Sequence, residues 1–148
     1  MTKFYAGIGS RETPADILTL MTSIAREAAA DGYILRSGAA QGADSAFEAG
    51  AGDAKEIWLP WRGFNNHPSR LLPSAEAFIL AEKFHPAWER CSPAARKLHA
   101  RNCHQVLGAD LATPVEFVIC WTKDGRASGG TGQAIRIAQA RGIPVKFL

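Results

Sequence analysis

Three short glycine-containing turns, each placed after an apolar strand-like run and before a helix, constrain this chain most. They lie at 7–11 (GIGSR), 37–44 (SGAAQGAD) and 128–132 (SGGTG). Such a turn leaves backbone N–H groups and a helix N-terminus at one edge of a parallel sheet, which is where α/β proteins hold phosphates. One such turn is weak evidence, but three in the same strand-to-helix position predict a shared phosphate site.

Apolar runs alternate with amphipathic segments along the whole chain. Strands are predicted at 3–8, 33–36, 55–61, 115–121 and 145–148. The first helix is predicted to begin at Pro14, with Thr13 as its N-cap, and to stop at Gly32. The second is predicted from 42 to 51, with a stop at Gly50 and Gly52. Three more helices are predicted at 74–84, at 93–107, and from the third turn to about residue 141. This order predicts an α/β fold in three layers, with a mainly parallel sheet of about five strands.

The chain of 148 residues is expected to form a single domain, 1–148. No apolar stretch approaches the ~20 residues that span a bilayer, and the N-terminus lacks a signal-peptide pattern, so we expect a cytoplasmic protein without a membrane partner. The three cysteines are odd in number and lack CxxC spacing, which predicts reduced thiols. Between 90 and 108 the chain has no acid and four basic residues: Arg90, Arg96, Lys97 and Arg101. These residues could contact phosphates, or they could form a solvated helix face.

Two common nucleotide motifs are missing. GIGSR has Glu12 where the dinucleotide fingerprint requires its third glycine, and the second strand ends in Arg36 instead of an acid that would hold a ribose hydroxyl. No GxxxxGK[ST] segment is present either. We therefore expect a phosphate site without NAD, without a nucleotide-hydrolase loop and without a cofactor.

Several side chains near the turns have two possible roles. Thr131 and the neighbouring N–H groups could surround an anion or form an ordinary flexible turn. Asp44 could cap a helix or contact a ligand, and Arg11 could clamp a phosphate or remain solvated. Arg101-Asn102 suits a phosphate or sugar, or belongs to a surface helix. The loop 62–73 follows the end of a strand, a position that often carries sites or lids.

Other residues are weaker candidates for a metal, base-stacking or catalytic role. His99 and Cys103 have i, i+4 metal-ligand spacing, but no third or fourth ligand is evident, so no metal is predicted. Trp61 and Trp121 fall at strand ends, where either could stack on a base, although tryptophans more often belong to the core. Glu116 lies near the wrong end of its strand for a catalytic base.

Four segments in order, GIGSR, LRSGAAQGAD (35–44), ARN (100–102) and SGGTGQA (128–134), resemble the Rossmann-like domain of the DNA-processing proteins DprA/Smf. That domain belongs to the SLOG superfamily, with the LOG phosphoribohydrolases as relatives. The resemblance covers essentially the whole chain, which looks like a minimal, stand-alone version. It implies that the ligand contacts Gly7, Gly9, Ser10, Arg11, Ser37, Gly38, Gly42, Asp44, Arg101, Asn102, Ser128, Gly129, Gly130, Thr131 and Gly132.

The chain differs from the LOG sequence pattern at several positions, including that of the catalytic glutamate. In the pattern PGGxGTxxE, Ser128 replaces the proline, Gln133 the threonine, and Arg136 stands where the catalytic glutamate is expected. Cleaving an N-glycosidic bond needs a carboxylate. The remaining candidates for catalysis are Arg101, at the position of a LOG catalytic arginine, and Asp44.

Three functions follow from these observations. The first is binding of a nucleotide or nucleotide-derived ligand for sensing, sequestration or processing. The second is a nucleoside-5′-monophosphate N-glycosidase, and the third is DprA-like binding of single-stranded DNA through Arg11, Arg96, Lys97 and Arg101. The first is preferred because the glycine turns are the stronger signal. The resemblance also implies a homodimer or higher homo-oligomer.

Overall fold

A computed structural model describes all residues, 1–148. The strands are β1 (Lys3–Gly9), β2 (Tyr33–Ser37), β3 (Lys55–Ile57), β4 (Val118–Trp121) and β5 (Val145–Phe147). The helices are α1 (Ala15–Ala30), α2 (Ala43–Ala51), α3 (Ala75–Phe84), α4 (Pro93–Leu107) and α5 (Gly129–Ala140), with short 3₁₀ turns η1 (Phe64–Asn66) and η2 (Trp88–Arg90). None of the helices is both long and apolar enough to cross a membrane.

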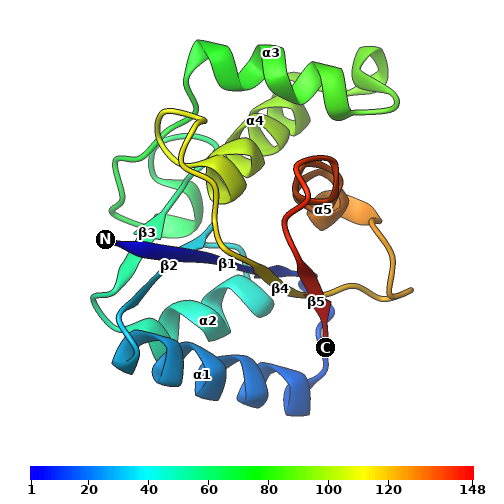
Figure 1. Cartoon of the computed structure of the whole chain (residues 1–148). Helices are drawn as coiled ribbons and strands as arrows, with labels where there is room; N and C mark the ends of the chain where they lie inside the picture. Colours follow the sequence, from blue (N-terminus) through cyan, green and yellow to red (C-terminus); the bar gives the residue numbers. More distant parts are fainter.

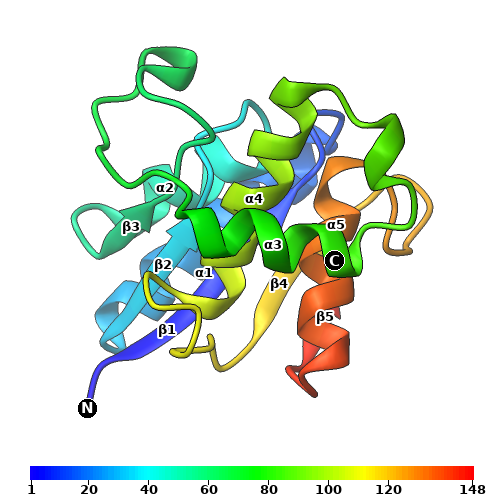
Figure 2. The same ribbon diagram turned by 90° about the horizontal axis from the view of Figure 1, so that it is seen from above.

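The five strands form one parallel sheet in the order β3-β2-β1-β4-β5. Helices α1 and α2 cover one face, and α3, α4 and α5 cover the other (Figure 1). Viewed from above, the second group lies over the strands (Figure 2). The predicted α/β fold in three layers is therefore confirmed.

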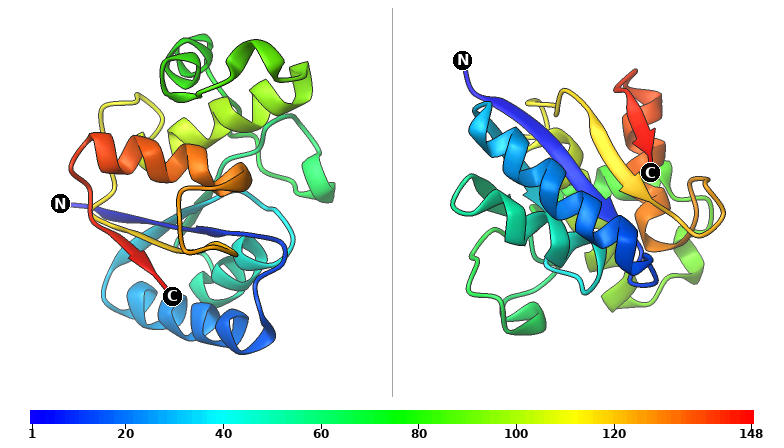
Figure 3. Two further views of the ribbon diagram at one scale, coloured as in Figure 1. Left: turned by 90° about the vertical axis from the view of Figure 1, so that its right-hand side faces the viewer. Right: turned by 90° about the horizontal axis from the view of Figure 1, so that it is seen from below.

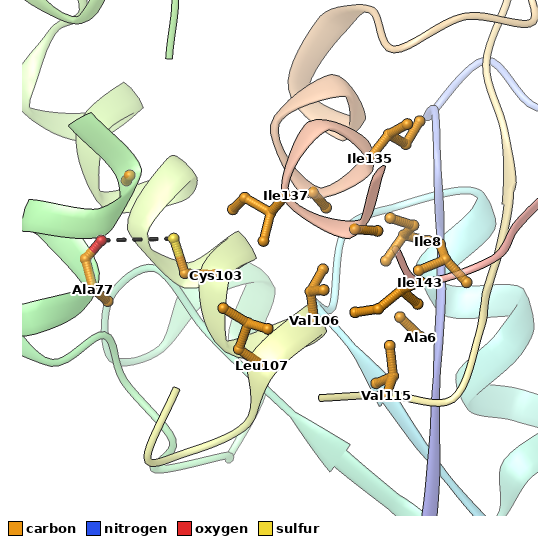
Figure 4. Packing of buried hydrophobic residues seen from close by; sticks show 14 of the residues in the cluster. Ala6, Ile8, Ala77, Cys103, Val106, Leu107, Val115, Ile135, Ile137 and Ile143 are labelled. Carbon is orange, nitrogen blue, oxygen red and sulfur yellow. Dashed lines mark hydrogen bonds between the residues drawn. The ribbon is translucent and has the colours of Figure 1, made fainter. Parts of the chain in front are cut away.

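Each face of the sheet has its own hydrophobic core. The larger one fills the space between the sheet and helices α3 to α5, where Ile8 of β1, Val106 of α4 and Ile135 of α5 are buried together (Figure 4). The smaller one lies under α1 and α2 and includes Met21 and Phe47. The two cores pack against opposite faces of the sheet, so the carboxyl ends of the strands are fixed relative to one another.

The start of α1 differs from the prediction. The helix begins at Ala15 with Pro14 as its N-cap, and no side chain caps it. The Thr13 hydroxyl instead donates to the carbonyl of Ser10 at 2.6 Å, and thus stabilises the turn after β1. The predicted N-cap role of Thr13 is wrong because its side chain bonds backwards into that turn.

Two strands are shorter than their apolar runs, and one glycine turn is helical. At β3 the ladder ends at Ile57, and Trp58 forms an isolated bridge with Leu71. At β4 the strand begins only at Val118. Of the residues just outside these strands, Trp58, Leu59 and Val115 are buried in the core, which explains why the apolar runs extend beyond the ladders. Most of the turn 128–132 forms the first turn of α5, so its N–H groups belong to a helix N-terminus.

Helix α2 contains a glycine that the sequence placed at its end. Gly50 lies inside α2, and a Cβ there would collide with the Thr22 carbonyl of α1. Gly52 is the C-cap, with φ 60°. The two helices run side by side under the sheet (Figure 3). Gly50 therefore permits this close contact, while only Gly52 ends the helix.

Candidate functional site

A cleft of about 550 Å³ opens at the carboxyl ends of the strands. Three chain segments form its walls: Gly9–Glu12 at the end of β1, the segment from Ala40 to Asp44 after β2, and Ser128–Thr131 at the start of α5. Strand β1 lies between β2 and β4, so the loops that follow these three neighbouring strands meet at one edge of the sheet. The three turns seen in the sequence thus share one cleft.

Ten of the fifteen predicted ligand residues line this cleft. They are Gly9, Ser10, Arg11, Asp44, Arg101, Asn102, Ser128, Gly129, Gly130 and Thr131. The other five lie behind its surface: Gly7, Ser37, Gly38, Gly42 and Gly132. A ligand contact by any of these residues stays a prediction, but the structure gives the second group a packing role.

Those five residues hold the walls in place. A Cβ on Gly7 would lie 2.6 Å from the ring of Phe47, and the buried Ser37 hydroxyl donates to the Gly7 carbonyl at 2.6 Å. Gly42 has φ 84°, and a Cβ there would meet the backbone of Arg11 at 2.9 Å. These close contacts bring the first and second turns together, which glycine alone permits here.

Arg101 is buried and fixed by the ends of two strands. Its Nη1 donates to the carbonyl of Gly38, after β2, at 2.6 Å and to that of Trp58, after β3, at 3.1 Å. Its Nε donates to Oδ1 of Asn102 at 2.9 Å. Nη2 has no partner in the chain and Arg101 lines the cleft, so this nitrogen is the donor left for a ligand.

Asn102 continues this chain of hydrogen bonds to the third turn. Its Nδ2 donates to the Gly130 carbonyl at 2.8 Å, so α4 is tied to the first turn of α5. Asn102 is 5% exposed and Arg101 6%, which makes water a poor substitute for these bonds. The Arg101-Asn102 pair therefore fixes the positions of the second and third turns.

Asp44 is a buried acid in the wall of the cleft. Its Oδ2 accepts a hydrogen bond from the N–H of Ala40 at 3.2 Å. Burial raises the pKa of Asp44 to about 6, against the opposing effects of the Arg101 charge and the Ala40 N–H. Asp44 thus both stabilises the second turn and presents a titratable group to the cleft.

The N-terminus of α5 offers the clearest anion site. The backbone N–H groups of Gly129, Gly130 and Thr131 have no acceptor in the chain, as is usual in the first turn of a helix. The preceding loop is held by Asp124, which accepts from the Ser128 hydroxyl at 2.7 Å and from the Arg126 N–H at 3.0 Å. These N–H groups and the helix dipole together favour a bound anion.

The predicted ligand residues leave out seven polar or aromatic residues that line the cleft. They are Glu12, Gln41, Phe64, Asn65, Gln105, Thr122 and Lys123. Phe64 and Asn65 come from the loop 62–73, which the sequence indicated only as a place for a site or lid. Asn65 has φ 51°, and its Nδ2 donates to the Ala39 carbonyl at 3.0 Å. That bond between distant loops has no signature in the sequence.

Several other candidates lie elsewhere. Arg136 bonds to Gln133 Oε1 at 2.9 Å and to the Ala127 carbonyl at 3.4 Å, and it does not line the cleft. Arg96 donates to the Trp88 carbonyl at 3.0 Å. Glu116 accepts from the Tyr33 hydroxyl at 3.1 Å, next to the starts of β2 and β4, so it lies at the opposite edge of the sheet.

The sequence matches no protein-family model and no curated protein. The fold is similar to DNA processing protein A from Helicobacter pylori, described for its single-stranded DNA binding mode, with a TM-score of 0.64 and 18% sequence identity. The match covers 98% of this chain and 64% of that one, so this chain corresponds to a part of the neighbour. At this identity the likeness establishes a DprA-like Rossmann fold.

Proposed function

We propose that the cleft binds nucleotide units of single-stranded DNA, with a phosphate at the N-terminus of α5. The observation that carries this proposal is the convergence of three glycine turns on one cleft of about 550 Å³, with the unpaired N–H groups of the first turn of α5 in its wall. Arg11 and Lys123 add exposed positive charge to its rim. The similar fold of a protein that binds single-stranded DNA supports it.

The phosphate needs more than one of these groups. A single exposed helix end stabilises an anion by only ~0.3–1 kcal/mol. Nη2 of Arg101 and the side chains of Arg11 and Lys123 supply charge-assisted hydrogen bonds in addition, each stronger than a neutral one. Affinity therefore depends on the turns acting together with the basic side chains.

A base has one aromatic surface available in the cleft. Phe64 lines it, with its ring 5.3 Å from that of Trp61 in an edge-to-face arrangement. Stacking on an aromatic side chain contributes about 1–3 kcal/mol per base and tolerates any sequence. Asn65, next to Phe64, offers an amide to the base edge. This contact would give binding that depends little on base identity.

A binding titration tests this proposal. Fluorescence anisotropy with labelled oligothymidylates of increasing length should show affinity that rises with length and falls with salt, with a slope near −0.7 per phosphate contacted. Arg11→Ala and Lys123→Ala should each weaken binding several-fold. Arg26→Ala, on the exposed side of α1, is the matched control and should leave it unchanged. Salt-independent binding, or equal loss in the control, would contradict the proposal.

A free nucleotide would use the same contacts, so the two ligands must be compared directly. Calorimetry with thymidine monophosphate and with an oligothymidylate separates them. Binding of the monophosphate as tight as that of the oligonucleotide would assign the cleft to a small nucleotide ligand, which is the function that the sequence alone favoured. Tighter binding of the longer strand supports DNA.

A second candidate function is cleavage of an N-glycosidic bond. The observation in its favour is Asp44, a cleft residue whose pKa of about 6 suits proton transfer near neutral pH. Incubation with a panel of nucleoside monophosphates should then release free base, and Asp44→Asn should abolish the release. If the wild-type protein releases no base, this candidate is eliminated while DNA binding is unaffected.

A further inference from the structure

Outside the cleft, three potential metal ligands from separate parts of the chain lie together. His85 follows α3, Cys91 follows η2, and His99 belongs to α4. One ligand atom of each lies within 4.8 Å of those of the other two, and the imidazole centroids of the two histidines are 4.3 Å apart. None of the three lines the nucleotide cleft.

This cluster replaces the pair that the helical spacing indicated. Cys103 does not face the His99 ring, because its thiol donates to the Ala77 carbonyl at 3.6 Å (Figure 4) and to the His99 carbonyl at 3.6 Å. His99 instead has His85 and Cys91 beside it. The third ligand that the sequence lacked is brought in by the segment between α3 and α4.

We propose that His85, Cys91 and His99 bind one Zn²⁺ ion through two imidazole nitrogens and a thiolate, with a fourth position open to water. Mixed nitrogen and sulfur ligands are the set that Zn²⁺ prefers in proteins. On binding, Cys91 loses its thiol proton to solvent and the sulfur forms the bond to zinc. No oxidation or reduction takes place.

The distances are close to those of a formed site. Tetrahedral Zn–N and Zn–S bonds of ordinary length place the ligand atoms about 3.3–3.6 Å apart. Cys91 Sγ is 3.8 Å from both ring nitrogens of His85. The widest ligand separation, within 4.8 Å, must close by about 1.5 Å at most, a shift of the size that side-chain rotation produces.

One ligand atom already lacks a partner. His99 Nδ1 is buried and has no hydrogen bond, an unfavourable state that a metal bond would relieve. Burial, together with the nearby charge of Arg136, lowers the pKa of both His85 and His99.

Two features limit the affinity. The Ala87 N–H donates to His85 Nδ1 at 3.0 Å, and the Cys91 thiol donates to the Ala87 carbonyl at 3.6 Å. Zinc binding must break these bonds. The guanidinium of Arg136 also repels a cation, while the charge of Glu89 acts on His85 in the opposite direction. We therefore expect weaker binding than at a preformed structural zinc site.

A bound ion would fasten the η2 segment to α4. His99 lies one helical turn before Asn102, and His85 and Cys91 flank η2 on either side. The metal would thus close the connection between α3 and α4 against the helix that carries the Arg101-Asn102 pair. Its expected effect is on stability, because no ligand of the metal reaches the cleft.

Calorimetric titration of the reduced protein with Zn²⁺ tests the proposal. One equivalent should bind, and Cys91→Ser and His85→Gln, both at partly exposed positions, should each weaken binding at least tenfold. His67→Gln is the matched control, since His67 is partly buried and bonds to Glu48 at 2.8 Å outside the cluster. Its affinity should equal that of the wild type.

Cobalt provides a second measurement that does not depend on stability. Co²⁺ bound at this site should show a thiolate-to-metal charge-transfer band that Cys91→Ser removes. Cys103 and Cys120 are buried, and Cys91→Ser leaves both thiols in place, so loss of the band in this variant assigns the thiolate to Cys91. Absence of stoichiometric binding, or equal binding by Cys91→Ser and the wild type, would overturn the proposal.

Discussion

Helices α1 and α4 are nearly equal in length but are used in opposite ways. In α1 only Met21 and Ala25 are fully buried, and the polar side chains face solvent. In α4 the whole second half, from Ala100 to Leu107, is buried, including four polar residues: Arg101, Asn102, His104 and Gln105. The first helix follows the hydrophobic pattern, whereas the second departs from it where the cleft is built.

The buried polar groups of α4 are paired mainly with backbone atoms of other segments. His104 illustrates this, since its Nε2 lies 3.1 Å from the Ser74 N–H and its Nδ1 lies 2.8 Å from the Gly108 carbonyl. These partners assign the proton to Nδ1, and the neutral ring stacks on Trp58 at 4.4 Å. Polar residues in such a helix therefore indicate which distant segments must meet.

The largest effect is expected when the polar network of α4 is broken. Arg101→Met keeps most of the side-chain volume but leaves the carbonyls of Gly38 and Trp58 unpaired and Asp44 without its nearby positive charge. The free energy of unfolding should fall by about 4 kcal/mol. Urea unfolding followed by tryptophan fluorescence measures it. A loss below about 1 kcal/mol would show that this network does not hold the turns together.

A substitution in the buried face of α1 should lower the stability of the protein without changing its affinity for oligonucleotides. Met21→Ala removes a fully buried side chain of the smaller core and should cost about 3 kcal/mol. Under conditions where the variant is folded, it should bind oligonucleotides as the wild type does. Parallel unfolding and anisotropy titrations check both points, and a change in affinity would contradict the separation of the two helices.

The acid beside Arg101 should make stability depend on pH. Because the pKa of Asp44 is about 6 in the folded chain and 3.8 ordinarily, the protonated carboxyl favours the folded state. This contribution, about 2–3 kcal/mol, is complete below pH 3.8 and is lost as the pH rises through 6. Asp44→Asn should lack this loss, so the difference between wild type and variant across pH 4–7 isolates it.

The smallest effect concerns the helix ends. Ser92 caps α4 by accepting from the Ala95 N–H at 3.1 Å, whereas α1 has no side-chain cap. Ser92→Ala should cost about 1 kcal/mol. Leu20→Ala, at a position of α1 that is 44% exposed, serves as the reference and should change stability by less than about 0.5 kcal/mol. Equal losses in thermal unfolding would contradict the importance of the cap.

These two regions also show how far the sequence can predict the structure. The periodic pattern of α1 and the glycine turns predicted the order of elements and the edge where the turns meet. The ends of β3 and β4 could not be predicted, because Trp58 is apolar and buried whether or not it joins the ladder. Phe64 and Asn65 were missed because loop conformation, here fixed by a bond to Ala39, follows no periodicity.

The contact between α1 and α2 has a consequence for how this sequence can vary. At position 50 even a methyl group would strike the Thr22 carbonyl, although the glycine shows no positive φ and ends no helix. In a library of all single substitutions, both positions should favour glycine, but for different reasons: position 50 because a Cβ has no space, and position 52 because φ 60° with ψ −125° is a backbone conformation that side chains avoid. We therefore expect related sequences to keep glycine at position 50 as strictly as any residue that lines the cleft.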